Sequence, residues 1–213
     1  MGFERNKKFT GRDYLLDQLD LALKTLDRHS YRAIVLYGTG GVGKTEVAIE
    51  YAYRHQKDFD SIFWVDATSL STIHRSLKEA ARRIIRHYKK GYRMEDPDYT
   101  KIAAELQLES LIDKSGSVAN SNDVQVKKAI MDWFTKEGNH RWLLIFDNYD
   151  DTNSFAIHDF FPSRSQQSII VTSRRTDFGR YRSGIEVKDL SPDEGLQLLK
   201  ESADLPELSP EGM

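Results

Sequence analysis

The sequence predicts an α/β fold in which helices cover both faces of a parallel sheet. Short, almost purely apolar runs alternate along the chain with segments whose apolar residues recur at helical spacing, and one such run leads directly into a glycine-rich loop. Continuous apolar runs are typical of parallel strands that are buried on both faces. Strands that alternate with helices indicate a parallel sheet joined by right-handed crossovers.

Each element follows from its own pattern. Apolar runs predict strands at 33–37, 61–65, 142–146 and 168–172, with a short fifth strand at 185–187. Ser191, Pro192 and Glu194 have the spacing of a capping box at the start of a helix. Helical periodicity predicts helices at 14–26, at 46–54, from about 73 to 85, around 104–111, at 126–134 and after 191.

Composition excludes several classes of protein. The chain has 213 residues, 39% of them hydrophobic and 30% charged, so it is able to bury a core. It has no apolar run near the ~18 residues of a membrane helix, and residues 1–8 lack the apolar stretch of a secretory signal, so we expect none. The lack of cysteine excludes disulfides and thiolate metal sites, and a net charge of −2 gives no overall attraction to nucleic acid or membranes. We expect a cytoplasmic protein without a membrane or nucleic-acid partner.

The loop after the first predicted strand has the sequence of a phosphate-binding loop. Residues 38–45 match G-x-x-x-x-G-K-[ST] between a strand and a helix. Glycines let backbone N–H groups turn toward a polyphosphate, and the N-terminus of the next helix attracts negative charge. Lys44 is expected to reach the β- and γ-phosphates, and the Thr45 hydroxyl to bind Mg²⁺. The predicted nucleotide-binding residues here are Gly38, Thr39, Gly40, Gly41, Val42, Gly43, Lys44, Thr45 and Glu46.

A carboxylate closes the predicted strand at 142–146. Asp147 is expected to hold Mg²⁺ together with Thr45 and so to take part in catalysis. Asn148 follows, where many hydrolysing P-loop proteins have a second carboxylate, and its amide orients water but accepts no proton. Asp150 and Asp151 remain alternatives for that role. The sequence therefore predicts slow hydrolysis, which is typical of a switch.

Two arginines follow the predicted strand at 168–172. The carboxyl ends of parallel strands border the ligand crevice of such a sheet. Arg174 is expected to sense the γ-phosphate and stabilise its charge, with Arg175 as the second choice.

Taken together, these residues resemble the nucleotide-binding module of the STAND class of P-loop NTPases, close to NB-ARC and NLR-like signalling proteins. The resemblance runs from Phe9 to about Ala203. Residues 9–13 resemble the family's hydrophobic-hydrophobic-Gly-Arg-Glu motif, and 40–45 its form of the phosphate loop. Residues 59–65 resemble its second strand, 143–151 its Walker B motif and 168–174 its sensor strand.

The resemblance carries expectations about fold and ligand. It implies a three-layer P-loop NTPase of the ASCE type, with a five-stranded parallel sheet in the order 5-1-4-3-2. It implies that Phe9, Thr10, Gly11 and Arg12 line the base pocket and that the ligand is ATP or ADP with Mg²⁺, with GTP or GDP as an alternative. Family members switch between an ADP-bound resting form and an ATP-bound assembling form. Other domains of a parent protein and a nucleotide-dependent homo-oligomer are therefore implied partners.

The nucleotide-binding domain is expected to span residues 1–204, followed by a frayed tail at 205–213. Within it we expect a helical insertion at about 86–136 with a flexible loop at about 115–122. Two other functions stay open. One is an inactive phosphate loop kept by a protein-interaction module. The other is an AAA-like, nucleic-acid-associated ATPase, suggested by a basic helix face at Arg82, Arg83, Arg86, Lys89, Lys90 and Arg93.

Overall fold

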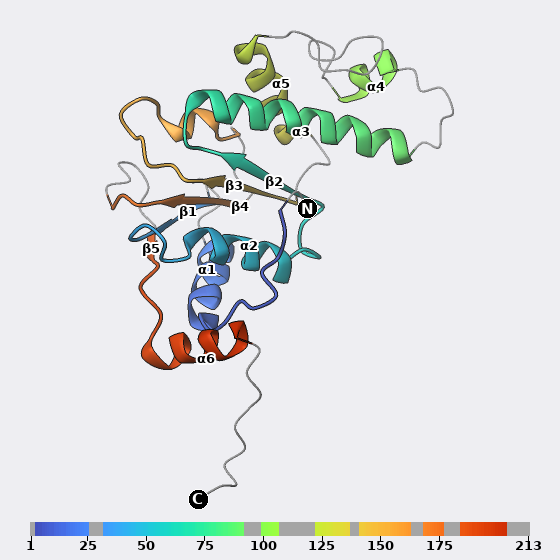
Figure 1. Cartoon of the computed structure of the whole chain (residues 1–213). Coiled ribbons are helices and arrows are strands. Elements are labelled where there is room, and N and C mark those ends of the chain that lie inside the picture. The colour runs from blue at the N-terminus through green and yellow to red at the C-terminus, as the bar shows by residue number, and fades with distance from the viewer. Residues whose placement is uncertain are drawn as a thin grey trace, which may run out of the picture.

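Five parallel strands form the sheet at the centre of the molecule (Figure 1). The computed structural model describes residues 3–25, 32–91, 99–106, 122–136, 141–162, 168–176 and 184–203. The strands are β1 (Arg32–Tyr37), β2 (Ser61–Asp66), β3 (Trp142–Asp147), β4 (Ser168–Ser173) and β5 (Gly184–Glu186). Their order, β2-β3-β4-β1-β5, confirms the order expected from the resemblance.

Helices cover both faces of this sheet, as the alternation of elements predicts (Figure 1). Helices α1 (Asp13–Thr25) and α2 (Lys44–Arg54) lie on one face. Helices α3 (Leu70–Gly91) and α5 (Asp123–Thr135) lie on the other, together with the short 3-10 helix η1 (Ile157–Phe160). The remaining helices are α4 (Tyr99–Leu106), next to α3, and α6 (Pro192–Ser202), next to the N-terminal segment.

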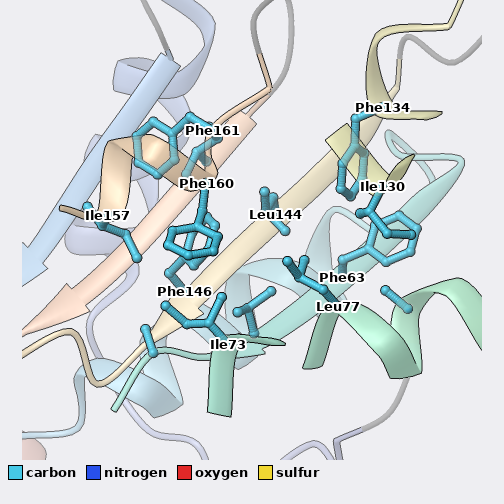
Figure 2. Packing of buried hydrophobic residues seen from close by; sticks show 14 of the residues in the cluster. Phe63, Ile73, Leu77, Ile130, Phe134, Leu144, Phe146, Ile157, Phe160 and Phe161 are labelled. Atoms are coloured by element: carbon cyan, nitrogen blue, oxygen red, sulfur yellow. The ribbon is translucent and has the colours of Figure 1, made fainter. Parts of the chain in front are cut away.

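Successive strand residues divide between two hydrophobic clusters, because side chains alternate across a sheet. In β3, Leu144 and Phe146 join the cluster under α3 and α5, whereas Leu143 and Ile145 join the cluster under α1 and α2. All six β3 residues are buried. Figure 2 shows the first cluster, in which aromatic rings from β2, β3, α5 and η1 meet.

Several helix ends differ from the sequence prediction. Helix α2 begins at Lys44, two residues earlier than predicted, because Gly43 in a left-handed conformation serves as its N-cap. Helix α4 ends at Leu106, and the rest of the predicted 104–111 helix lies outside the described residues. So do nearly all of the predicted loop at 115–122 and the tail at 205–213. Helix η1 was not predicted.

The predicted capping box of α6 is confirmed. The Ser191 side chain accepts from the backbone of Glu194, and the Glu194 side chain accepts from the backbone of Ser191. Two leucines of α6 are exposed in the described structure, Leu196 at 53% and Leu199 at 67%, whereas Leu198 is partly buried. No helix in the described ranges is both long and apolar enough for a membrane span.

A charge cluster ties α2 to the N-terminal segment. Glu50 is almost fully buried and accepts two hydrogen bonds from Arg5, at 2.9 Å and 2.7 Å, and one from Arg54 at 2.8 Å. Arg54 also pairs with Asp13 of α1 at 2.6 Å. The hydrogen bonds from Arg5, joined by those from Arg54, lower the pKa of Glu50 although its burial opposes this.

Phe134→Ala tests how far the aromatic cluster stabilises the fold. The Phe134 side chain is 0% exposed, and its ring centroid lies 5.0 Å from that of Phe63 and 4.5 Å from that of Trp142. We expect the variant to lose about 3–5 kcal/mol of unfolding free energy in urea titrations, because a buried ring leaves a cavity. Leu199→Ala, on the exposed side of α6, should change it by no more than about 0.5 kcal/mol. Equal losses would contradict this account.

Glu50→Gln tests the charge cluster through its pH dependence. A carboxylate whose pKa is lowered on folding adds stability above its unfolded value of ~4.3, and this gain disappears as the pH falls through the lower folded value. Because both arginines are partly exposed, we expect a loss of only about 1–2 kcal/mol at pH 7, and the difference from the unmodified chain should shrink below about pH 4. Glu79→Gln, which removes longer ion pairs on the surface of α3, is the control. A constant difference between pH 3 and 7 would rule out the ionic origin.

Candidate functional site

The phosphate loop joins the end of β1 to the start of α2 through backbone conformations that favour glycine. Gly38, Gly41 and Gly43 have φ angles of 151°, 79° and 92°. A Cβ on Gly38 would lie 2.4 Å from the carbonyl oxygen of Val187. Val187 is itself held next to β1, because its backbone N–H donates to the carbonyl oxygen of Tyr37 at 2.7 Å. Gly43 caps α2 but has no side chain to accept from the first-turn N–H groups, and such a helix N-terminus attracts anions.

Lys44 is folded back onto this loop. Its ammonium donates to the carbonyl oxygens of Gly38 at 2.9 Å and Thr39 at 2.7 Å. The residue is 7% exposed, and burial lowers the pKa of its ammonium. The positive charge of Lys44 therefore lies against the phosphate loop, next to the first turn of α2.

Asp147 connects the phosphate loop to two strands. Its Oδ1 atom accepts from the Thr45 hydroxyl at 2.8 Å and from the Thr172 hydroxyl at 2.6 Å. Burial raises the pKa of Asp147, while the bonds from Thr172 and Thr45 act in the opposite direction. The structure thus brings together Thr45 and Asp147, the two predicted metal ligands. It also adds Thr172, which the sequence analysis did not single out.

Asn148 lies in a left-handed turn just beyond β3, with φ of 64°. Asparagine adopts this conformation more readily than most residues. Its backbone N–H donates to the Thr172 hydroxyl at 2.9 Å, and its side-chain amide donates to Asp147 Oδ2 at 3.2 Å. The Asn148 side chain therefore contacts the carboxylate that Thr45 also binds.

Arg174 lies between Asp150 and the phosphate loop. Its Nε is 3.0 Å from Asp150 Oδ2, and its backbone N–H donates to Asp150 Oδ1 at 2.7 Å. Its guanidinium also lies 3.6 Å from the position that a Cβ on Gly40 would take. The structure therefore places Arg174 next to the loop and pairs it with Asp150, one of the two aspartates that the sequence offers as alternatives to Asn148.

The segment at residues 9–12 reaches the site through Arg12. The Arg12 guanidinium donates to the carbonyl oxygens of Val42 at 2.6 Å and Lys188 at 3.2 Å. Its other terminal nitrogen, Nη1, is buried and has no hydrogen-bond partner within the described part of the chain, as is also true of Glu46 Oε2. Arg12 thus lies against the phosphate loop, as Gly43 is next to its guanidinium.

Helix α6 holds the same segment from the other side. Glu194 Oε1 accepts from the backbone N–H of Arg12 at 3.0 Å, and the Thr10 hydroxyl donates to Glu201. A Cβ on Gly11, whose φ is 67°, would lie 2.5 Å from Glu194. Sequence reasoning recognised Glu194 only as a capping residue, because a contact across 182 positions leaves no local signal.

A groove of about 530 Å³ opens next to Arg12. It lies between the start of α1, strand β5 and the start of α6. Phe9 is not among its lining residues and packs instead against the core under α1 and α2. The lining residues are Arg12, Tyr14, Leu15, Gln18, Gly184, Ile185, Glu186, Lys188, Asp189 and Glu194.

Comparison with known proteins agrees with this geometry. A model of the NB-ARC domain matches residues 15–207. A nucleotide-binding leucine-rich repeat (NLR)-like protein of Hyaloscypha variabilis is 26% identical over 221 residues, an alignment that covers 94% of this chain. It covers 19% of that relative, so this chain spans about a fifth of the relative's length.

A solved structure supports the fold alone. The crystal structure of Cdc6p from Pyrobaculum aerophilum superposes with a TM-score of 0.56 at 14% identity. The superposition covers 96% of this chain and 52% of that one. Together with the strand order, this likeness shows a three-layer α/β P-loop NTPase fold.

Alanine at Gly38 and at Gly41 separates close packing from backbone strain in the phosphate loop. A Cβ at Gly41 would have no heavy atom within 4 Å, so Gly41→Ala should cost only the strain of a positive φ, about 1 kcal/mol. Gly38→Ala adds a clash with the Val187 carbonyl, and we expect a loss of about 3 kcal/mol or more. Chemical denaturation of the nucleotide-free chain measures both, and a Gly41→Ala loss as large as that of Gly38→Ala would contradict the assigned contact.

Proposed function

Since the chain belongs to the NB-ARC family of nucleotide-binding STAND NTPase modules, we propose that it is an adenine-nucleotide switch with slow hydrolysis. The observation that carries this proposal is the hydrogen bond of 2.8 Å between Thr45 and Asp147. It joins the phosphate loop to the end of β3, with Arg174 beside the same loop. These are the parts that a P-loop NTPase uses to hold phosphates and a metal ion.

The phosphates would bind along residues 38–46. Lys44 already donates to two loop carbonyls, so it would exchange these bonds for bonds to the β- and γ-phosphates. The free N–H groups at the start of α2 would bind the phosphate oxygens between them. Arg174 would contact the γ-phosphate.

Magnesium fits the oxygens of Thr45 and Asp147. Mg²⁺ prefers hard oxygen ligands and usually takes only one or two from the protein, with water and substrate phosphates as the others. The described residues hold no group of three or more His, Cys, Asp or Glu side chains that could bind a metal ion. When bound, the ion would neutralise charge on the phosphates.

Slow hydrolysis is proposed from the chemistry next to Asp147. The adjacent side chain is the amide of Asn148, which can orient a water molecule but cannot take its proton. Asp150 is engaged by Arg174, and Asp151 accepts from the backbone N–H groups of Asn153 and Ser154. A site of this kind would hold a nucleotide for long periods between turnovers.

The base would lie near residues 9–12, in the groove beside Arg12. Adenine is proposed because the chain has no N-K-x-D guanine motif. The direct test is to denature the purified chain and identify the released nucleotide by ion-exchange chromatography. ADP or ATP would support the proposal. GDP or GTP would show that the base is guanine and not adenine, but the proposed phosphate-binding residues would stand.

The wider context of the switch is also proposed. The similar NLR-like protein is about five times as long as the matched region. We propose that residues 1–204 act as one domain within a longer cytoplasmic signalling protein and that the nucleotide controls its self-association. On the predicted basic face of α3, Arg82 and Arg83 both lie near Glu79, which favours an ordinary solvated helix face over a nucleic-acid surface. Arg93 of that face lies outside the described residues.

Lys44→Ala tests whether the phosphate loop binds nucleotide. A ligand at ~100 times its Kd should stabilise the unmodified chain by about 2.7 kcal/mol, which raises the Tm by roughly 5–10 °C for a domain of this size. We expect Lys44→Ala to abolish the shift produced by Mg-ADP. Lys128→Ala, on the exposed side of α5, should keep it. If Lys44→Ala kept the full shift, the loop would not be the binding site, and no shift in any variant would indicate an inactive loop.

A further inference from the structure

Asp150, which follows β3, and Arg174, which follows β4, form a contact that no single sequence motif includes. The Asp150 carboxylate binds both the backbone N–H and the Nε of Arg174, at 2.7 Å and 3.0 Å. The same guanidinium lies over Gly40, at the phosphate loop. One arginine therefore contacts both an aspartate and the loop that would hold the phosphates.

We propose that Asp150 is the positioning residue that holds Arg174 when no γ-phosphate is bound, and that it thereby sets the preference between nucleoside triphosphate and diphosphate. This inference rests on the proposed function. Asp150 acts through its contact with Arg174 and makes no contact of its own with the nucleotide or the metal ion in this proposal.

The charges determine the direction of the effect. A γ-phosphate that recruits the Arg174 guanidinium competes with the Asp150 carboxylate for it. The backbone N–H of Arg174 also binds the Asp150 carboxylate, so the carboxylate stays in place for this competition. The competition disfavours the triphosphate and leaves the diphosphate almost unaffected, because only the triphosphate has the extra charged group.

The exposure of this ion pair supports the proposal. Both partners are solvent-accessible, with side-chain exposures of 67% for Arg174 and 34% for Asp150, and exposed ion pairs are weak enough for a phosphate to displace.

Asp150→Asn provides the test, since the amide oxygen can still accept from the Arg174 backbone. Isothermal titration calorimetry would measure Kd for Mg-ADP and for a non-hydrolysable Mg-ATP analogue. We expect the ratio of the two to shift toward the triphosphate by roughly three- to tenfold, the scale of one partly exposed charge pair. Asp151→Asn makes the same charge change one residue away and should leave the ratio within about twofold.

A double-mutant cycle shows whether Asp150 acts through Arg174. In an Arg174→Ala background, Asp150→Asn should no longer change the ratio. A shift that persisted there would overturn the inference, as would equal weakening of both nucleotides by Asp150→Asn, which indicates a purely structural role. If the unmodified chain bound neither nucleotide, the proposed function would fail and this inference with it. Binding with an unchanged ratio would overturn the inference alone.

An independent measurement needs no change at Asp150. The NMR resonance of the Arg174 Nε–H group, assigned by its loss in Arg174→Ala, reports the contact with Asp150. It should keep its position when Mg-ADP binds to the unmodified chain and move when the Mg-ATP analogue binds. Equal movement with both nucleotides would show that Asp150 does not hold Arg174 in the diphosphate state.

Discussion

The buried carboxylate of Asp147 is the constraint on which the site depends. It closes β3 and accepts from Thr45, at the start of α2, and from Thr172, near the end of β4. Strands β3 and β4 are parallel neighbours, and their register, with Phe146 opposite Val171, brings their carboxyl ends side by side. Strand β1 lies on the other side of β4 from β3, and the phosphate loop that follows β1 can then reach the ends of both β3 and β4. The site is thus defined by strand order, and α2 cannot move relative to β3 without breaking a bond to this carboxylate.

Every cation of the site is already bound by protein oxygens. Lys44 donates to loop carbonyls, Arg12 donates to the carbonyl of Val42, and Arg174 pairs with Asp150. Binding of a polyphosphate would exchange these contacts, and its net free energy would be the difference between the bonds gained and the bonds lost. Small changes in the protein partners of these cations can therefore alter selectivity without abolishing binding.

The amino-acid pattern predicted the elements well and the contacts between them poorly. The strands at β1, β3 and β4 are apolar runs that only a doubly covered sheet accommodates, and the capping box of α6 is a local signal. Strand order came from family resemblance, since no local pattern encodes it. The contacts of Thr172, Asp150 and Glu194 are long-range bonds between ordinary polar residues, and only the folded arrangement reveals them.

The two sides of α6 have different chemical characters. Its acidic residues Glu194 and Glu201 bind the backbone of Arg12 and the hydroxyl of Thr10, while Leu196 and Leu199 are exposed. Polar bonds thus link the helix to the segment that carries Arg12, while these two leucines face away from it into solvent. If a partner that bound those leucines displaced α6 and thereby changed nucleotide affinity, the nucleotide would change the affinity of that partner by the same factor, because coupled equilibria are reciprocal.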